Sequence, residues 1–349
     1  MKRIKWVILL QSAVIIALLA GMALMWRSGK RSIKLDKPAH DMVRLALLQY
    51  STTGKTKEQI ESKVLKKIES AFKQGAEYVI LPEYAFISYA NQRNAVAEAK
   101  GIDETEVIGS VKALARANSG YIIFNHLIKE GESVYNAAIA VDKKGEVRHV
   151  HYKTILSSGD GRIGLTPGEK FENVALTHGK VGFVVCRSAK DLFNHMLVQS
   201  NDHSQSSVHS KDYLERITNL TFMANTTFDK SQIVVIQLAH AGRTLPVKLG
   251  RTGLDYVWDA PELYVEMAQH WAMASKSYVA LVNKGGAEQP HSIYAGHSCV
   301  IAPNGRIVGA AGYAPGMLLV DLPLQSDGML DMTSEKLYET VVYDIPFPH

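Results

Sequence analysis

The sequence holds only two cysteines in 349 residues, Cys186 and Cys299. Two thiols are too few for a disulfide framework, so the fold must depend on a hydrophobic core. Hydrophobic residues make up 46% of the chain, which is enough for a sizeable core. A bridge between the two cysteines is one alternative. The other is that Cys299, which lies in an apolar run, is a buried free thiol.

The chain also lacks an excess of charge once its first 40 residues are set aside. The net charge of +5 comes from 39 basic and 34 acidic residues. Eight of the basic residues lie within residues 1–40, together with a single acidic residue, Asp36. Because the remainder is close to neutral, nucleic acid is not expected as a partner.

Spacing typical of a metal site is missing as well. His203 and His209 lie in a polar stretch rich in Ser and His, with no Cys or acid at a suitable distance along the chain. This pattern favours a solvated loop, so no metal site is expected.

One long apolar run departs from this globular pattern. Residues 6–26 carry no charged side chain, and crossing a bilayer core takes about 20 such residues. Trp6 and Trp26 suit the two membrane interfaces, and basic residues flank both ends. We expect a single-pass anchor in the lipid bilayer over residues 6–26. A signal peptide cleaved near residues 21–23 is the alternative.

The positive charges on both flanks do not decide how the anchor is oriented. A basic tail of only five residues, 1–5, is most simply left in the cytoplasm. This places the large domain on the other side of the membrane, as an extracytoplasmic domain.

Beyond a polar linker over residues 27–41, strand and helix patterns alternate. Residues 43–49 form an apolar run typical of a buried strand. Residues 56–74 place apolar side chains at helical spacing, and a second helix is expected over residues 103–118. The pattern therefore predicts an α/β fold.

The composition shows no sharp break between the two halves of the chain. We therefore expect one domain over residues 42–322, with an inserted surface segment at about residues 199–230. Residues 323–349 are expected to form an extended C-terminal arm.

Three reactive side chains stand where predicted strands end. Cys186 follows an apolar run over residues 181–185, Glu83 follows residues 78–82, and Lys153 follows residues 148–152. The carboxyl ends of strands are where open α/β sheets place their chemistry. A cysteine needs a base or a cation beside it to become a useful nucleophile. Glu83 can take the thiol proton, and Lys153 can stabilise an oxyanion.

Several blocks in this order resemble the nitrilase superfamily, the carbon-nitrogen hydrolases. The resemblance covers about residues 42–322. It rests on residues 43–49, Ile80-Leu81-Pro82-Glu83, Tyr135-Asn136-Ala137-Ala138, His151-Tyr152-Lys153, Thr166-Pro167-Gly168 and residues 181–186, followed by residues 272–286, Gly296-His297-Ser298 and residues 301–305.

The resemblance implies a four-layer α-β-β-α sandwich that commonly assembles into homodimers or larger homo-oligomers. It also implies that Glu83, Lys153 and Cys186 form a catalytic triad. Such a triad attacks a small-molecule amide, with a nitrile as the second choice, and forms a cysteine acyl-enzyme. No cofactor is expected for this chemistry.

The chain departs from the superfamily pattern near the site. Many members carry a second glutamate between the lysine and the cysteine, whereas residues 157–162 read Ser-Ser-Gly-Asp-Gly-Arg, with Asp160 as the candidate replacement. Members also tend to follow the cysteine with an aromatic residue and an acid, whereas Arg187 follows it here. We expect Asp160, Arg187, Gln237 and His240 to line the substrate pocket.

Two other functions fit the same sequence. One is an N-acyltransferase of the same superfamily, which would pass the acyl group to an amine. The other is a catalytically inactive, membrane-tethered binding protein.

Overall fold

The computed structural model describes residues 35–39, 41–54, 56–201, 211–240, 244–245, 256–257, 262–289, 292–333 and 341–347. Residues 37–347 form one unit, and the other unit, residues 1–36 with 348–349, is described only at Leu35 and Asp36. The predicted membrane anchor, residues 6–26, lies outside the described residues. Among the helices that are described, none has both the length and the apolar character needed to cross a bilayer.

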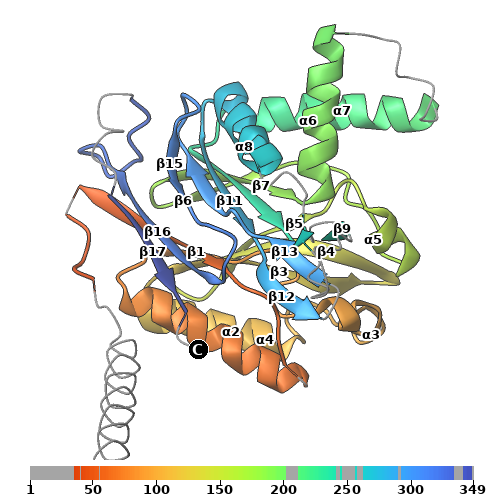
Figure 1. The fold of residues 1–349 in the computed structure, drawn as a ribbon, viewed down its shortest axis with the longest axis horizontal. Helices are drawn as coiled ribbons and strands as arrows, with labels where there is room; N and C mark the ends of the chain where they lie inside the picture. Colours follow the sequence, from red (N-terminus) through yellow and green to blue (C-terminus); the bar gives the residue numbers. More distant parts are fainter. Residues whose placement is uncertain are drawn as a thin grey trace, which may run out of the picture. The chain divides into compact units, whose positions relative to one another are not determined.

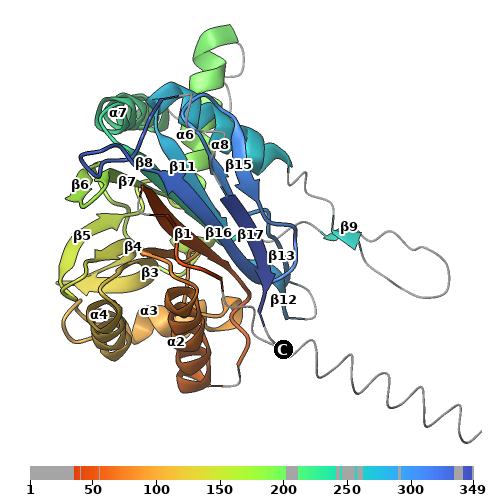
Figure 2. The same cartoon turned by 90° about the vertical axis from the view of Figure 1, so that its left-hand side faces the viewer.

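The first of two large sheets has seven strands. In spatial order they are β17 (Val341–Pro346), β16 (Gly316–Pro323), β1 (Met42–Gln49), β2 (Tyr78–Ile80), β3 (Tyr121–Glu130), β4 (Ser133–Val141) and β5 (Val147–Tyr152). The central strands β1, β2 and β3 run parallel, and the remaining pairs are antiparallel. Helices α2 (Lys57–Lys73) and α4 (Glu106–Asn118) cover its outer face, as Figures 1 and 2 show.

The second large sheet has six strands. Their order is β15 (Ile307–Ala310), β14 (Cys299–Ile301), β11 (Tyr278–Asn283), β8 (Ile233–Leu238), β7 (Gly179–Val185) and β6 (Asn173–Leu176). Here β7, β8 and β11 run parallel. Its outer face is covered by α6 (Arg187–Asn201), α7 (Lys211–Phe228) and α8 (Glu262–Ser275) (Figure 1).

The remaining elements are short. They are η1 (Tyr89–Asn91), α3 (Gln92–Ala97), α5 (Ser158–Arg162), the paired strands β9 (Thr244–Leu245) and β10 (Tyr256–Val257), and the hairpin of β12 (Gly285–Gln289) and β13 (Ser292–Ala295).

Alternation along the strands of the second sheet supplies side chains to the cores on its two faces. Side chains such as Leu45 and Ile123 of the first sheet pack against Phe183 of the second in the layer between the sheets. On the far side of the second sheet, apolar side chains such as Val184 pack against Trp271 and other residues of the covering helices. Successive residues of a strand point to opposite faces, so strands β7, β8, β11 and β14 of the second sheet contribute to both cores. The predicted order of four layers, helix, sheet, sheet and helix, is confirmed.

The helical pattern over residues 56–74 is confirmed by α2. Thr56 caps it, because its Oγ1 accepts from the amide of Gln59 at 3.3 Å. The segment expected as an insertion, about residues 199–230, contains the end of α6 and all of α7. The C-terminal arm contributes β17, which pairs with β16 at the edge of the first sheet.

Candidate active site

The three predicted reactive residues meet because the ends of their strands meet. Lys153 directly follows β5, Cys186 directly follows β7, and Glu83 lies three residues beyond β2. Backbone bonds tie these ends to the neighbouring β8, since the amide of Cys186 donates to Gln237 O at 2.9 Å and that of Glu83 donates to Leu238 O at 3.3 Å. The site therefore lies where the two sheets come together at one end.

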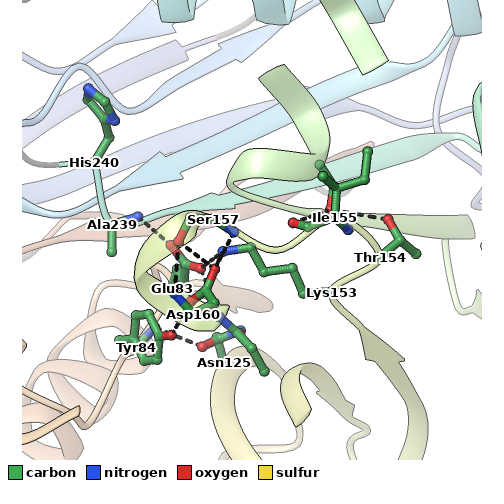
Figure 3. Close-up of polar contacts among 12 residues, drawn as sticks. Glu83, Tyr84, Asn125, Lys153, Thr154, Ile155, Ser157, Asp160, Ala239 and His240 are labelled. Atoms are coloured by element: carbon green, nitrogen blue, oxygen red, sulfur yellow. Dashed lines mark hydrogen bonds and ion pairs between the residues drawn. The ribbon is translucent and has the colours of Figure 1, made fainter. Parts of the chain in front are cut away.

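Lys153 binds two carboxylates at the centre of this site. Its Nζ lies 2.8 Å from Glu83 Oε1 and 2.7 Å from Asp160 Oδ2, and all three side chains are at most 4% exposed (Figure 3). Burial favours the neutral amine, but electrostatic interactions with Glu83, Cys186 and Asp160 outweigh it and raise the pKa of Lys153. Lys153 is thus a fixed cation between two anions.

Further donors fix the carboxylate of Glu83. Asn136 Nδ2 donates to Oε1 at 2.9 Å. The amide of Ala239 donates to Oε2 at 3.0 Å (Figure 3). Asn136 is itself held by Asn125, whose Nδ2 donates to Asn136 Oδ1 at 2.6 Å. We did not predict either asparagine as a site residue, although Asn136 lies in one of the blocks that carry the resemblance. Glu83 is therefore held from both sheets in one orientation.

Asp160 is held as firmly as Glu83. It lies in α5, where Ser157 and Asp160 form a reciprocal capping box. Tyr84 donates its hydroxyl hydrogen to Asp160 Oδ1 at 2.6 Å, and Ser157 donates to Oδ2 through both its amide and its Oγ. Burial opposes ionisation, but Lys153 and these donors outweigh it and lower the pKa of Asp160. The structure therefore brings Asp160 to the site, in contact with Lys153.

Cys186 stands at the junction of β7 and α6 in a left-handed backbone conformation, with φ of 45°. Its side chain is partly buried, and it is a free thiol, as is the buried Cys299. Burial, followed by the charge of Glu83, raises the pKa of the Cys186 thiol, and Lys153 opposes that rise. A hydrogen bond with Glu83 also contributes to the raised pKa. The thiol is thus protonated at rest, and Glu83 is the adjacent group that can take its proton.

The other predicted substrate contacts lie close to the site, in different settings. Arg187 begins α6, and its Nε lies 2.6 Å from Asp191 Oδ1. Gln237 is buried in β8 and donates through Nε2 to Leu81 O at 2.7 Å, whereas its Oε1 has no hydrogen-bond partner in the described part of the chain. His240 follows Ala239, and its ring lies near that of Tyr264 and points away from the carboxylates in Figure 3.

No group of three His, Cys, Asp or Glu side chains within the described ranges is arranged to hold a metal ion. His203 and His209, which we expected in a solvated loop, lie outside those ranges.

A comparison of the whole sequence identifies the family. The sequence profile of the family described as carbon-nitrogen hydrolase matches residues 44–189 and 260–328. The chain belongs to the carbon-nitrogen hydrolase family. The resemblance to the nitrilase superfamily is thereby confirmed.

Curated relatives resemble part of the chain. A nitrilase of Pyrococcus abyssi is 30% identical over 152 residues, which are 42% of this chain and 56% of the relative. A citrullinase of Francisella tularensis subsp. tularensis is 25% identical over 151 residues, 41% of this chain and 52% of the relative. The chain thus spans about half the length of the curated relatives it matches.

Solved structures match over a longer stretch. An amidase from Nesterenkonia sp. superposes with a TM-score of 0.62 over 87% of this chain and 97% of that protein, at 18% identity. A variant of the Nesterenkonia sp. AN1 amidase that carries the acetamide moiety of fluoroacetamide on its active-site cysteine matches equally well, with a TM-score of 0.62 at 19% identity over 87% of this chain and 98% of that protein. At these identities the likeness shows that the fold is shared.

Proposed function

We propose that this carbon-nitrogen hydrolase cleaves a non-peptide amide through an acyl-enzyme on Cys186. The supporting observation is the buried contact of Lys153 with both Glu83 and Asp160, beside the strand-end thiol of Cys186. A thiol, a proton acceptor and a fixed cation are the groups that acyl transfer requires.

In the first half of the proposed reaction, Cys186 Sγ attacks the amide carbonyl carbon as Glu83 takes the thiol proton. The carbonyl oxygen becomes an oxyanion, stabilised by the positive charge of Lys153 and the N-terminal end of α6. The oxyanion then collapses, and the C–N bond breaks. Glu83 passes its proton to the nitrogen, which leaves as ammonia or an amine.

In the second half, water attacks the thioester carbon while Glu83 takes one of its protons. The C–S bond breaks, the carboxylic acid leaves, and the proton on Glu83 returns to the Cys186 sulfur. Glu83 acts in turn as base and acid, so no metal or organic cofactor enters the cycle.

An intact-mass experiment tests this proposal. The purified full-length chain is incubated with a panel of small amides and nitriles, and then quenched in acid. We expect an acyl adduct on Cys186 with at least one amide, together with release of its acid. Glu83→Gln should slow adduct formation by at least about 100-fold, the usual contribution of a general base. Cys186→Ala serves as the blank.

If no substrate acylates Cys186, and Glu83→Gln does not slow its alkylation by iodoacetamide, the site is not a nucleophilic one and the inactive binding protein is the better description. Adding amines to the same reaction separates hydrolase from N-acyltransferase. A transferase would give the N-acyl amine in preference to the free acid.

Gln237 is the strongest of the proposed substrate contacts. Its buried Oε1 accepts no hydrogen bond within the described residues, and an unsatisfied buried acceptor is unfavourable by about 1–3 kcal/mol. A substrate N–H group would satisfy it. We expect Gln237→Met to raise KM for an amide more than it lowers kcat. Arg187 and His240 remain proposed contacts on the strength of their place beside Cys186 and Ala239.

We also propose that residues 6–26 anchor the chain in a bilayer with its catalytic domain outside the cytoplasm. The support is the charge-free run itself, which has the length of a membrane span. Extraction of membranes at alkaline pH would leave an anchored chain in the pellet and release a cleaved one. The homodimer or higher oligomer is likewise a proposal, and light scattering of the purified chain would test it.

A further inference from the structure

A second buried ion pair lies close to the candidate site. Lys284 follows β11 and Glu288 lies in β12, with Lys284 Nζ 3.3 Å from Glu288 Oε2. Their side chains are 0% and 1% exposed. Burial lowers the pKa of Lys284, and the charges of Glu288 and Glu83 oppose this shift. Removing two charges from water is unfavourable, so a pair of this kind is weak support for stability and needs another reason.

The pair joins three segments that are far apart in the sequence. Lys284 Nζ donates to Thr52 Oγ1 at 2.7 Å and to Ile87 O at 3.0 Å. Glu288 accepts from the amide of Tyr89 through Oε1 and from Thr52 Oγ1 through Oε2 at 2.9 Å. The chain after β1, the chain after Glu83 and the β12–β13 hairpin are therefore fastened at one point.

The segment that follows Glu83, residues 84–89, has a strained backbone that these contacts hold in place. Tyr84 has φ of 52°, in the left-handed region that an ordinary side chain rarely adopts. No helix or strand lies between the end of β2 and the start of η1 at Tyr89. At its start, Tyr84 N donates to Asn125 Oδ1 at 2.7 Å. At its end, Ile87 and Tyr89 are bound by the buried pair, so a strained conformation is held from both sides.

We propose that Lys284 and Glu288 are positioning residues that set the place of Glu83 for proton transfer by tying down residues 87–89. They do not touch the substrate, and they act through the backbone of this segment. The proposal rests on the proposed function of Glu83. Since both ions are required to hold the segment, replacing either one loosens it.

Two variants and a matched control test the proposal in the purified full-length chain. In Glu288→Gln, an amide nitrogen replaces one of the two carboxylate oxygens, both of which accept hydrogen bonds. The group that donates to that oxygen then has no acceptor. Lys284→Met with Glu288→Leu removes both charges and leaves no unpaired ion, which keeps the interior dry and packed. The control, Asp321→Asn, weakens the buried Arg44–Asp321 pair, which lies 2.6 Å apart between β1 and β16, near the start of β1.

The readouts are the iodoacetamide alkylation rate of Cys186, kcat and KM for an amide that acylates it, and the urea midpoint. We expect Glu288→Gln and the double variant to lower the alkylation rate and kcat by about 100-fold, the effect of a displacement of about 1 Å, with KM changed by less than about threefold. Asp321→Asn should lower the urea midpoint and leave both rates within about twofold of wild type.

Wild-type rates in the double variant would overturn the positioning role, because the charges would then serve folding alone. Rates lowered equally by Asp321→Asn would overturn it too, since any buried pair would have the same effect. A wild-type Cys186 that no amide acylates, and whose alkylation Glu83→Gln does not slow, would instead overturn the proposed function, and the positioning role with it.

Discussion

Replacing Asp160 with asparagine removes one negative charge from the candidate site and keeps its shape. Asp160 Oδ2 accepts from Lys153 Nζ, Ser157 N and Ser157 Oγ, whereas Oδ1 accepts from the hydroxyl of Tyr84. The new amide nitrogen therefore fits best at the Oδ1 position. The Tyr84 hydroxyl can rotate there to accept a hydrogen bond instead of donating one.

The expected loss follows from the contact that changes most. A hydrogen bond between Lys153 and a carboxylate becomes one to a neutral carbonyl, a difference of about 1 to 2 kcal/mol. If the bond orients Lys153 beside Cys186, the alkylation rate of Cys186 falls by about 5- to 30-fold. Asp160→Ala would remove all four bonds and lower stability by about 3–5 kcal/mol, close to the whole stability of a marginal domain. The asparagine variant is therefore the informative one.

The assay is the rate of Cys186 alkylation by iodoacetamide between pH 6 and 9, read by peptide mass, together with the free energy of unfolding in urea. Asp327→Asn makes the same chemical change on an exposed turn and should leave the rate unaltered. An unchanged rate in Asp160→Asn, alongside a clear loss in Lys153→Ala, would refute the idea that Asp160 acts on the site through Lys153.

Three further measurements follow from buried groups. Burial lowers the pKa of His126 to about 4. Between that value and its usual pKa, the unfolded chain binds a proton that the folded chain does not. Stability therefore decreases as the pH is lowered. We expect a loss of about 2 kcal/mol from pH 7 to pH 5, largely absent in His126→Asn, from urea unfolding at both pH values. Gly182→Ala would place a Cβ 2.5 Å from Phe228 and should destabilise the chain by about 1–3 kcal/mol, measured as a lower urea midpoint. Asp321→Ala leaves Arg44 buried without its carboxylate and should lower stability by about 3–5 kcal/mol in the same assay.

The sequence pattern predicted the strand ends well because an apolar run stops there and a reactive or charged residue follows. Glu83, Lys153 and Cys186 each follow an apolar run, and the structure brings Glu83 and Lys153 to 2.8 Å. The apolar spacing of α2 was equally readable, since one face of that helix is buried and the other is solvated.

Contacts between segments far apart in the sequence could not be predicted from such local patterns. Lys284 and Thr52 are 232 positions apart, and nothing local to either residue indicates the other. The spacing of Ser157 and Asp160 did hold a signal for a helix start, although it could not reveal the contact with Lys153. The four-residue spacing of Arg187 and Asp191 likewise fits an ion pair along a helix, once α6 is known to begin at Arg187.

The left-handed backbone at Cys186 lowers the stability of the fold, although the proposed reaction needs a cysteine there. A side chain with a Cβ is disfavoured there by about 1–2 kcal/mol, whereas glycine adopts the same conformation freely. A chain selected for stability alone would therefore drift from cysteine to glycine at this position and lose the thiol in doing so. Retaining Cys186 lowers the free energy of unfolding. Mutations that stabilise the rest of the domain offset this loss, so the thiol can be retained.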